Sequence, residues 1–144
     1  MPAERSAVAR WAPAVVWAGV IFLASTHWFS GEHTGSVVLG FLARLLPGAD
    51  VRTLEAIHAA LRKLGHFSEY LILGVLIVRA LATDGRWRPR QAVVAVSLAA
   101  AYAATDELHQ AFVPGRTAAV TDVLIDASGA LAGQLALALR HRRR

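Results

Sequence analysis

Residues 64–83 read LGHFSEYLILGVLIVRALAT, and most of this stretch is apolar. Its length matches the ~20 residues that a helix needs to cross about 30 Å of hydrocarbon. Nevertheless, His66 and Glu69 lie near its start. Ionisable groups at membrane depth are costly, so they are expected to face a bundle interior or a wet cavity. The stretch therefore predicts a transmembrane helix that carries a polar site.

Three more apolar stretches, at residues 11–28, 91–109 and 121–139, are candidates for spans. The stretch at residues 91–109 reaches spanning length only when its acidic end is included. The chain is 56% hydrophobic and has a mean hydropathy of +0.45, both above the average for soluble proteins. We therefore expect one domain, residues 1–144, with an all-α membrane fold. The predicted architecture is a four-transmembrane-helix bundle.

The connection between the first two spans is too polar to cross a membrane. Residues 31–35 suggest a loop, and apolar residues at helical spacing over 37–46 indicate a helix at the membrane interface. Pro47-Gly48 ends this helix, and Asp50 is a plausible cap for a second amphipathic stretch that leads into Lys63. We expect a short amphipathic helical segment here.

Orientation follows from the basic residues, because cytoplasmic segments are enriched in Lys and Arg. Ten of the fifteen cations lie before the first span, in the last turns of the second span and the connection that follows it, and after the fourth. With the uncleaved first span retained, an N-in and C-in topology satisfies all three segments. A cleaved signal peptide is the alternative for the first span, but no convincing cleavage site follows it. The polar motifs are then expected to face outward.

The net charge of +5 does not indicate a nucleic-acid partner, because most arginines flank apolar segments instead of forming a stripe on a soluble face. The chain has no cysteine. It can therefore form neither disulfides nor cysteine-ligated zinc sites.

In the second span, Lys63, His66 and Glu69 share one helix face. One interpretation is structural: Lys63 extends to the interface, while the other two satisfy each other and hold neighbouring helices. The other is functional: Glu69 is a general base, a metal ligand or a receptor for a cationic group, and His66 is its proton partner or co-ligand.

The third span ends in Asp106-Glu107-Leu108-His109-Gln110. Asp106 shares a face with His109 and with Gln110, whereas Glu107 points about a quarter-turn away. Asp106 is therefore the better inward candidate. The alternative is that this motif caps a helix end close to water.

Arg116 follows a predicted Pro114-Gly115 turn. It could neutralise a neighbouring carboxylate or bind a phosphate or carboxylate of a substrate. In the fourth span, Asp122 and Asp126 lie four residues apart; Asp126 is the better site candidate, since Asp122 could interact with the helix dipole. Gly129 and Gly133 below them predict close helix packing within one subunit.

These motifs resemble the VanZ-like family of small bacterial membrane proteins. The resemblance covers residues from about 63 to 133, through Lys-x-x-His-Phe-x-Glu-Tyr, Ala-x-x-Asp-Glu-x-His-Gln-x-Phe-Val-Pro-Gly-Arg and Asp-x-x-x-Asp-x-x-Gly. It implies a four-span protein of the bacterial cytoplasmic membrane, and the member that names the family is associated with teicoplanin resistance. Carried over by motif, the site residues are Lys63, His66, Glu69, Tyr70, Asp106, Glu107, His109, Gln110, Arg116, Asp122 and Asp126. Asparagine is frequent in the family at the position of Asp126, which argues against a metal held by this carboxylate.

The leading functional prediction is an outward-facing site that binds or processes a cell-envelope component, with a contribution to glycopeptide resistance. As an enzyme, the protein would use Glu69 or Asp106 as base, His66 or His109 as proton shuttle, and Arg116 as anion holder. Lys63, Tyr70, Gln110, Asp122 and Asp126 would complete substrate binding. The alternatives are a non-catalytic lipid- or antibiotic-binding module, a proton-coupled transporter, and a purely structural cluster. The expected partners are membrane lipids and a lipid-linked envelope substrate or glycopeptide; the sequence identifies no cofactor, metal or oligomer.

Overall fold

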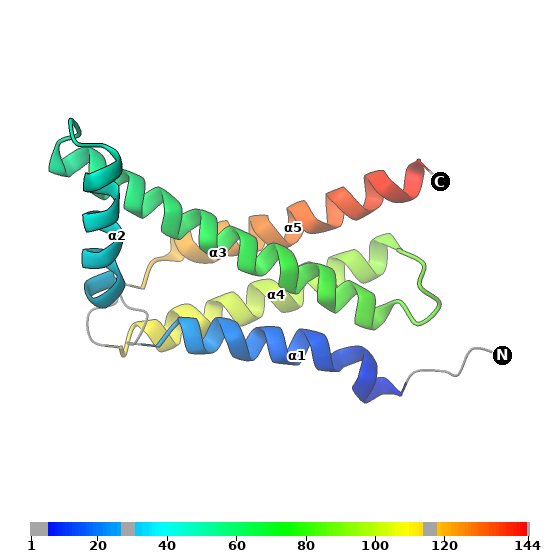
Figure 1. Cartoon of the computed structure of the whole chain (residues 1–144). Coiled ribbons are helices and arrows are strands. Elements are labelled where there is room, and N and C mark those ends of the chain that lie inside the picture. The colour runs from blue at the N-terminus through cyan, green and yellow to red at the C-terminus, as the bar shows by residue number, and fades with distance from the viewer. Residues whose placement is uncertain (1–5, 27–30, 114–117, 144) are drawn as a thin grey trace.

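The computed structural model describes residues 6–26, 31–113 and 118–143, and every regular element in these ranges is a helix. Figure 1 shows the five helices in chain order. They are α1 (Ala7–Ala24), α2 (Gly31–Leu45), α3 (Val51–Leu81), α4 (Pro89–Gln110) and α5 (Val120–Arg142).

Helix α3 is the centre of the structure, because it packs against each of the other four helices. α1, α3, α4 and α5 run in alternating directions, and the two ends of the chain lie at the same end of the bundle (Figure 1). The connection from α3 to α4 lies at that end too. The carboxyl ends of α1 and α4 and the amino end of α5 lie together at the opposite end.

The distribution of apolar residues is that of a membrane protein. Many large apolar side chains are exposed, such as Val16 on α1 and Leu135 on α5, whereas α4 buries alanines. Small residues at interfaces let helix backbones approach closely in a bilayer, where large apolar side chains can face lipid. Within the described residues, α1, α3 and α5 are long and apolar enough to cross a membrane. The all-α membrane fold is therefore confirmed, with three candidate spans; α4 has 22 residues but is less apolar.

The boundaries of several elements differ from the sequence-based expectation. α1 begins at Ala7, before residue 11, and ends at Ala24, where the sequence analysis had continued the span to residue 28. Residues 27–30 lie outside the described part of the chain. The loop expected over residues 31–35 is wrong, because α2 begins at Gly31. Glycine in a helix costs only about 1 kcal/mol, which packing can offset, and Gly35 packs closely against His58 of α3.

The amphipathic segment and the second span form one continuous helix. Asp50 caps α3 as expected, since its side chain accepts a hydrogen bond from the Thr53 N–H at 2.8 Å. Hydrogen bonding to Thr53, through its side chain and its backbone N–H, stabilises the ionised form and lowers the pKa of Asp50. The 31 residues of α3 extend over roughly 45 Å, more than the hydrocarbon thickness. Its amino-terminal part therefore projects beyond the bundle.

Helix α2 lies across this projecting end of the bundle (Figure 1). It exposes Val37, Phe41 and Leu45, which are spaced four residues apart and form one apolar stripe. The structure thus confirms an amphipathic helix between the first span and the second. A helix of this kind, lying across the bundle axis, suits the interface of a membrane.

Candidate functional site

The inward face of α4 changes from small to polar residues along its length. Ala95, Ala99 and Ala103 are fully buried, and their spacing of four residues places them on one face. Asp106 and Gln110 continue this face and are also buried, at 3% and 1% exposure. The packing that buries the alanines therefore carries two polar side chains into the interior at the carboxyl end of α4.

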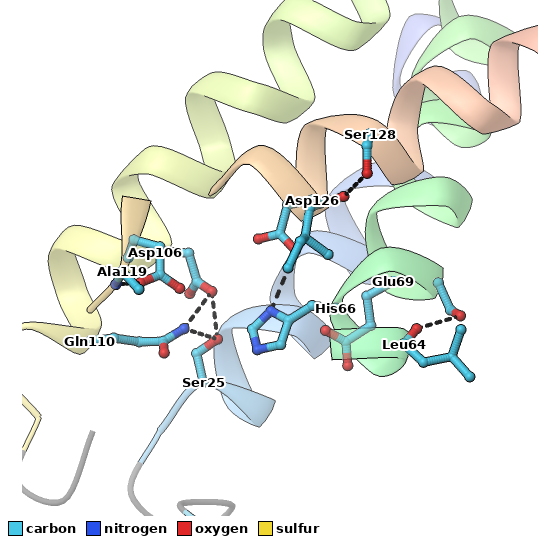
Figure 2. A network of polar contacts seen from close by, with 12 residues as sticks. Ser25, Leu64, His66, Glu69, Asp106, Gln110, Ala119, Asp126 and Ser128 are labelled. Carbon is cyan, nitrogen blue, oxygen red and sulfur yellow. Dashed lines mark hydrogen bonds and ion pairs between the residues drawn. The ribbon is translucent and has the colours of Figure 1, made fainter. Parts of the chain in front are cut away.

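Asp106 is held by side chains from two helices. Its Oδ2 accepts a hydrogen bond of 2.7 Å from the Ser25 hydroxyl and one of 3.0 Å from the Gln110 amide (Figure 2). Ser25 is the residue that ends α1. The predicted pairing of Asp106 with Gln110 is therefore present, and Ser25, which the motif analysis did not select, completes a three-residue network between α1 and α4.

Glu107 is buried as well, at 5% exposure, although its position about a quarter-turn from Asp106 predicts that it points away from the interior. Its Oε2 accepts a hydrogen bond of 2.8 Å from the backbone N–H of Ala119, just before α5. α4 packs against both α3 and α5, so two of its faces are covered. Adjacent carboxyl groups on α4 therefore both enter the interior, one toward α1 and the other toward α5.

His66 and Asp126 form an ion pair between α3 and α5, with 3.5 Å between Nδ1 and Oδ1 (Figure 2). The Asp126 side chain is 1% exposed and that of His66 is 13% exposed. Gly129 makes this approach possible, because a Cβ atom there would overlap the carbonyl oxygen of Phe67. The Gly129 and Gly133 packing predicted from sequence thus lies at the α3–α5 contact.

Tyr70 and Glu69 lie one turn farther along α3. Tyr70 is fully buried, is 6.2 Å from Tyr102 between ring centroids, and is within electrostatic reach of Asp106 and Asp126. Glu69 is half-buried, and its backbone carbonyl accepts a hydrogen bond of 2.9 Å from the Trp17 indole. Figure 2 shows its carboxylate on the same side of α3 as the His66 ring.

The four other predicted site residues are not among the buried groups that the structure describes. Lys63 is exposed, and Asp122 is half-buried in the first turn of α5. His109 is half-buried and packs on Phe22, with 5.0 Å between the ring centroids. Arg116 lies outside the described residues. Hydrogen bonds, the ion pair and electrostatic reach bring together His66, Glu69, Tyr70, Asp106, Glu107, Gln110 and Asp126, with Ser25 added; we call this set the polar cluster.

The polar cluster contains buried polar atoms without hydrogen-bond partners among the described residues. They are Asp106 Oδ1, Glu107 Oε1, both carboxylate oxygens of Asp126, the Tyr70 hydroxyl and His66 Nδ1. The His66–Asp126 pair is close enough to attract electrostatically but is not a hydrogen bond. Burying such groups without partners costs about 1–3 kcal/mol each. A concentration of them at one place is typical of a functional site.

A second buried polar group, nearer the opposite end of the bundle, offers a contrast. The Gln134 amide donates a hydrogen bond of 2.9 Å to the carbonyl of Gly74. Its oxygen accepts one of 3.4 Å from the Trp87 indole. Because both ends of this amide are satisfied, Gln134 has the properties of a structural group that joins α5 to α3 and to the α3–α4 connection.

The described residues contain no group of three or more His, Cys, Asp or Glu side chains arranged to hold a metal ion. His66 and Asp126 come together as a pair, and Asp106 is bonded instead to Ser25 and Gln110.

Fold and cluster together define a helical membrane protein with a buried polar site near one end of its bundle. The chain belongs to the VanZ/LLP1 family, whose model matches residues 11–141. This match includes all the residues of the polar cluster. Neither a curated protein nor a solved structure matches the chain.

Proposed function

We propose that this protein crosses the bacterial cytoplasmic membrane four times and uses the polar cluster to bind or process a cell-envelope component. In this proposal α4 crosses the membrane in addition to α1, α3 and α5, because it packs against α3 and α5 and its 22 residues exceed the ~20 that a span needs. Both ends of the chain lie in the cytoplasm, and the polar cluster faces outward.

The charge distribution supports this orientation. Arg10, Arg79, Arg86 and Arg140 belong to the end of the bundle where the chain begins and finishes. The polar cluster belongs to the opposite end. Since cytoplasmic segments are enriched in Lys and Arg, the cluster would face the outer leaflet, from which lipids and lipid-linked envelope precursors are reached.

The observation that carries the proposal is the set of buried, unpartnered polar atoms in the cluster. A purely structural cluster would be expected to satisfy its groups as Gln134 does. At depth in a bilayer, no water is available to satisfy such groups. The free energy cost of the unpartnered atoms is offset if a ligand with a polar head group supplies their hydrogen-bond partners, and this favours a binding site.

The chemistry available to the cluster suits proton transfer as well as binding. In the enzyme form of the proposal, Glu69 or Asp106 is the base and His66 or His109 is the proton shuttle, while Arg116 holds an anion. The remaining candidates, Lys63, Tyr70, Gln110, Asp122 and Asp126, contribute to substrate binding.

Non-catalytic binding of a lipid or glycopeptide is the second candidate, and the geometry of Asp106 favours it. Two donors fix one oxygen of this carboxylate, as suits an anchoring group. Proton-coupled transport has less support. The interior face of α4 continues from the cluster as buried alanines, Ala103, Ala99 and Ala95, so this face carries no polar path through the bundle.

The glycopeptide part of the proposal is tested by measuring teicoplanin susceptibility of bacteria that express the wild type, Glu69→Gln or Asp106→Asn at equal membrane abundance. We expect the wild type to protect and both variants to lose protection while they remain folded. Glu55→Gln, an exposed carboxylate on the same helix as Glu69, is the matched control and should protect. Equal protection by all variants would contradict a role for the cluster, and a wild type without effect would reject glycopeptides as its target.

A further inference from the structure

The unpartnered atoms of the polar cluster are mostly hydrogen-bond acceptors. Four are carboxylate oxygens without hydrogen bonds, contributed by Asp106, Glu107 and Asp126, and each of these residues is at least nine-tenths buried. One of the four, Asp126 Oδ1, forms the ion pair with His66. Among the unpartnered atoms of the described cluster residues, the Tyr70 hydroxyl and His66 Nδ1 are the two that can act as donors. A ligand that satisfies this site must therefore bring N–H or O–H groups.

The charges of the cluster point in the same direction. Asp106, Asp126 and Glu107 are buried, and they lie within electrostatic reach of one another through Asp126. The described part of the cluster opposes them with one imidazole, that of His66. Lys63, one turn earlier on α3, is exposed. A buried carboxyl group is costly as an anion unless it takes up a proton or is paired with a cation, so a cation would be stabilised here in place of protons and an anion would not.

Aromatic side chains border the carboxylates. Tyr70 is fully buried within electrostatic reach of Asp106 and Asp126, and Tyr102 lies beside it with 6.2 Å between ring centroids. The faces of aromatic rings attract cations within about 6 Å. Carboxyl groups within electrostatic reach of these tyrosines are a favourable setting for an organic cation.

We propose that the polar cluster binds the primary ammonium group of an envelope lipid head group. An ammonium supplies three N–H donors together with a positive charge, which matches both the acceptor surplus and the charge surplus. This inference rests on the proposed function and assigns the chemical class of the ligand. It places the ammonium among Asp106, Glu107 and Asp126, whose unpartnered oxygens come from α4 and α5.

The test compares two short-chain lipids that share a phosphodiester. The full chain, purified in detergent, is titrated with dihexanoyl phosphatidylethanolamine, which has the ammonium, and with dihexanoyl phosphatidylglycerol, which lacks it. We expect the first to bind at least about tenfold more tightly, as the loss of hydrogen bonds to charged groups implies. Equal or tighter binding of phosphatidylglycerol would overturn the ammonium inference and leave envelope-lipid binding intact. Binding of neither lipid would count against both.

Variants locate the ammonium. Asp106→Asn and Glu107→Gln should each weaken phosphatidylethanolamine binding about tenfold or more, because an amide replaces a charged acceptor. Glu55→Gln, exposed on α3, should not weaken it. Circular dichroism identifies the variants that remain helical. If either variant loses its helical structure, Asp126→Asn is tested in its place. Unchanged affinity in the folded variants would overturn the proposal.

Free ethanolamine separates two sources of the same chemistry. If ethanolamine binds as tightly as the lipid, a soluble amine is a sufficient ligand. If it binds more weakly, the acyl chains contribute and the ligand is a lipid. Either result supports recognition of the ammonium, provided that binding depends on Asp106.

Discussion

Ser25 supports the polar cluster although it carries no charge. Its hydroxyl donates to Asp106 Oδ2 at 2.7 Å, and both residues are buried. The Gln110 amide donates to the same oxygen at 3.0 Å. These two bonds orient Asp106 so that its other oxygen, Oδ1, is left without a partner among the described residues. Ser25 is thus a positioning residue for the site.

Ser25→Ala should lower the free energy of unfolding by about 1–3 kcal/mol, because it removes a buried hydrogen bond to a carboxylate. Unfolding of the purified protein in mixed micelles measures the change. Ser128→Ala is the control: this hydroxyl is exposed and bonds within its own helix, so we expect a change within about 0.5 kcal/mol. Equal losses in both variants would show that Ser25 has no special role.

His66 and Asp126 should respond unequally to substitution. His66→Gln removes the ion-pair partner of a carboxylate that is 1% exposed, and breaking such a pair costs roughly 3 kcal/mol or more. Asp126→Asn removes that buried carboxylate and leaves His66, which is more exposed at 13%, so it should cost less, roughly 1 kcal/mol. The same unfolding measurement on both single variants and the double variant gives their coupling energy. Additive effects would show that the two side chains do not interact.

The chemistry of individual residues was only partly predictable from sequence. The pairing of Asp106 with Gln110 follows from their spacing of four residues on one helix and is present in the structure. The burial of Glu107 was not predicted, because helix spacing does not reveal that two faces of α4 are covered. Ser25 was missed for a related reason: its partner lies 81 residues away. Its position at the end of an apolar run, at the same membrane depth as Asp106, was the available signal.

Helices α3 and α5 hold the site because they approach each other closely. Gly129 lies against the Phe67 carbonyl, and Gly133 lies against Leu71 and Val75. Gly74 of α3 in turn packs on the backbone of Ala130. This contact sets the spacing between His66 and Asp126, so stability and site geometry depend on the same glycines.

Gly129→Ala should therefore destabilise the protein by about 3 kcal/mol, because a Cβ atom that overlaps the Phe67 carbonyl oxygen forces the helices apart. Thermal unfolding in detergent measures this effect. Gly19→Ala on α1 is the matched control, since nothing lies within 4 Å of its Cβ position. It should be neutral or stabilising by up to about 1 kcal/mol. A stable Gly129→Ala protein would contradict the close approach.

The existence of the helices was more predictable than their limits. Apolar runs of spanning length gave α1, α3 and α5, and helical spacing gave the amphipathic α2. The start of α2 at Gly31 was missed, because local propensity disfavours Gly-rich helices and the contact between Gly35 and His58 is tertiary. The amphipathic stretch and the second span merge into α3 because residues 51–81 contain no proline to end the helix between them.

The proposed topology assigns the two ends of the bundle to opposite sides of the membrane. Because the chain has no cysteine, single thiols can be introduced at exposed positions without a background. Ala111→Cys, next to α4 at the end of the polar cluster, should react with a membrane-impermeant reagent in intact cells. Thr83→Cys, in the α3–α4 connection, should react only after permeabilisation. Labelling of Thr83→Cys alone in intact cells would show that the site faces inward.

Composition and charge predicted the class of the chain, and three motifs predicted where its polar groups meet. The nearness of these motifs follows from antiparallel helices, which bring the end of α4 beside the start of α5 (Figure 1). Which groups remain without partners could not be predicted, since that depends on the packing of α1, α3, α4 and α5 together. These unpartnered groups are the basis for inferring a ligand.

Native mass spectrometry of the protein released from bacterial membranes tests ligand binding by the polar cluster directly. We expect the wild type and Glu55→Gln to retain one envelope lipid each, and Asp106→Asn to lose it at equal folding. Identical lipid retention by all three proteins would contradict binding at the cluster.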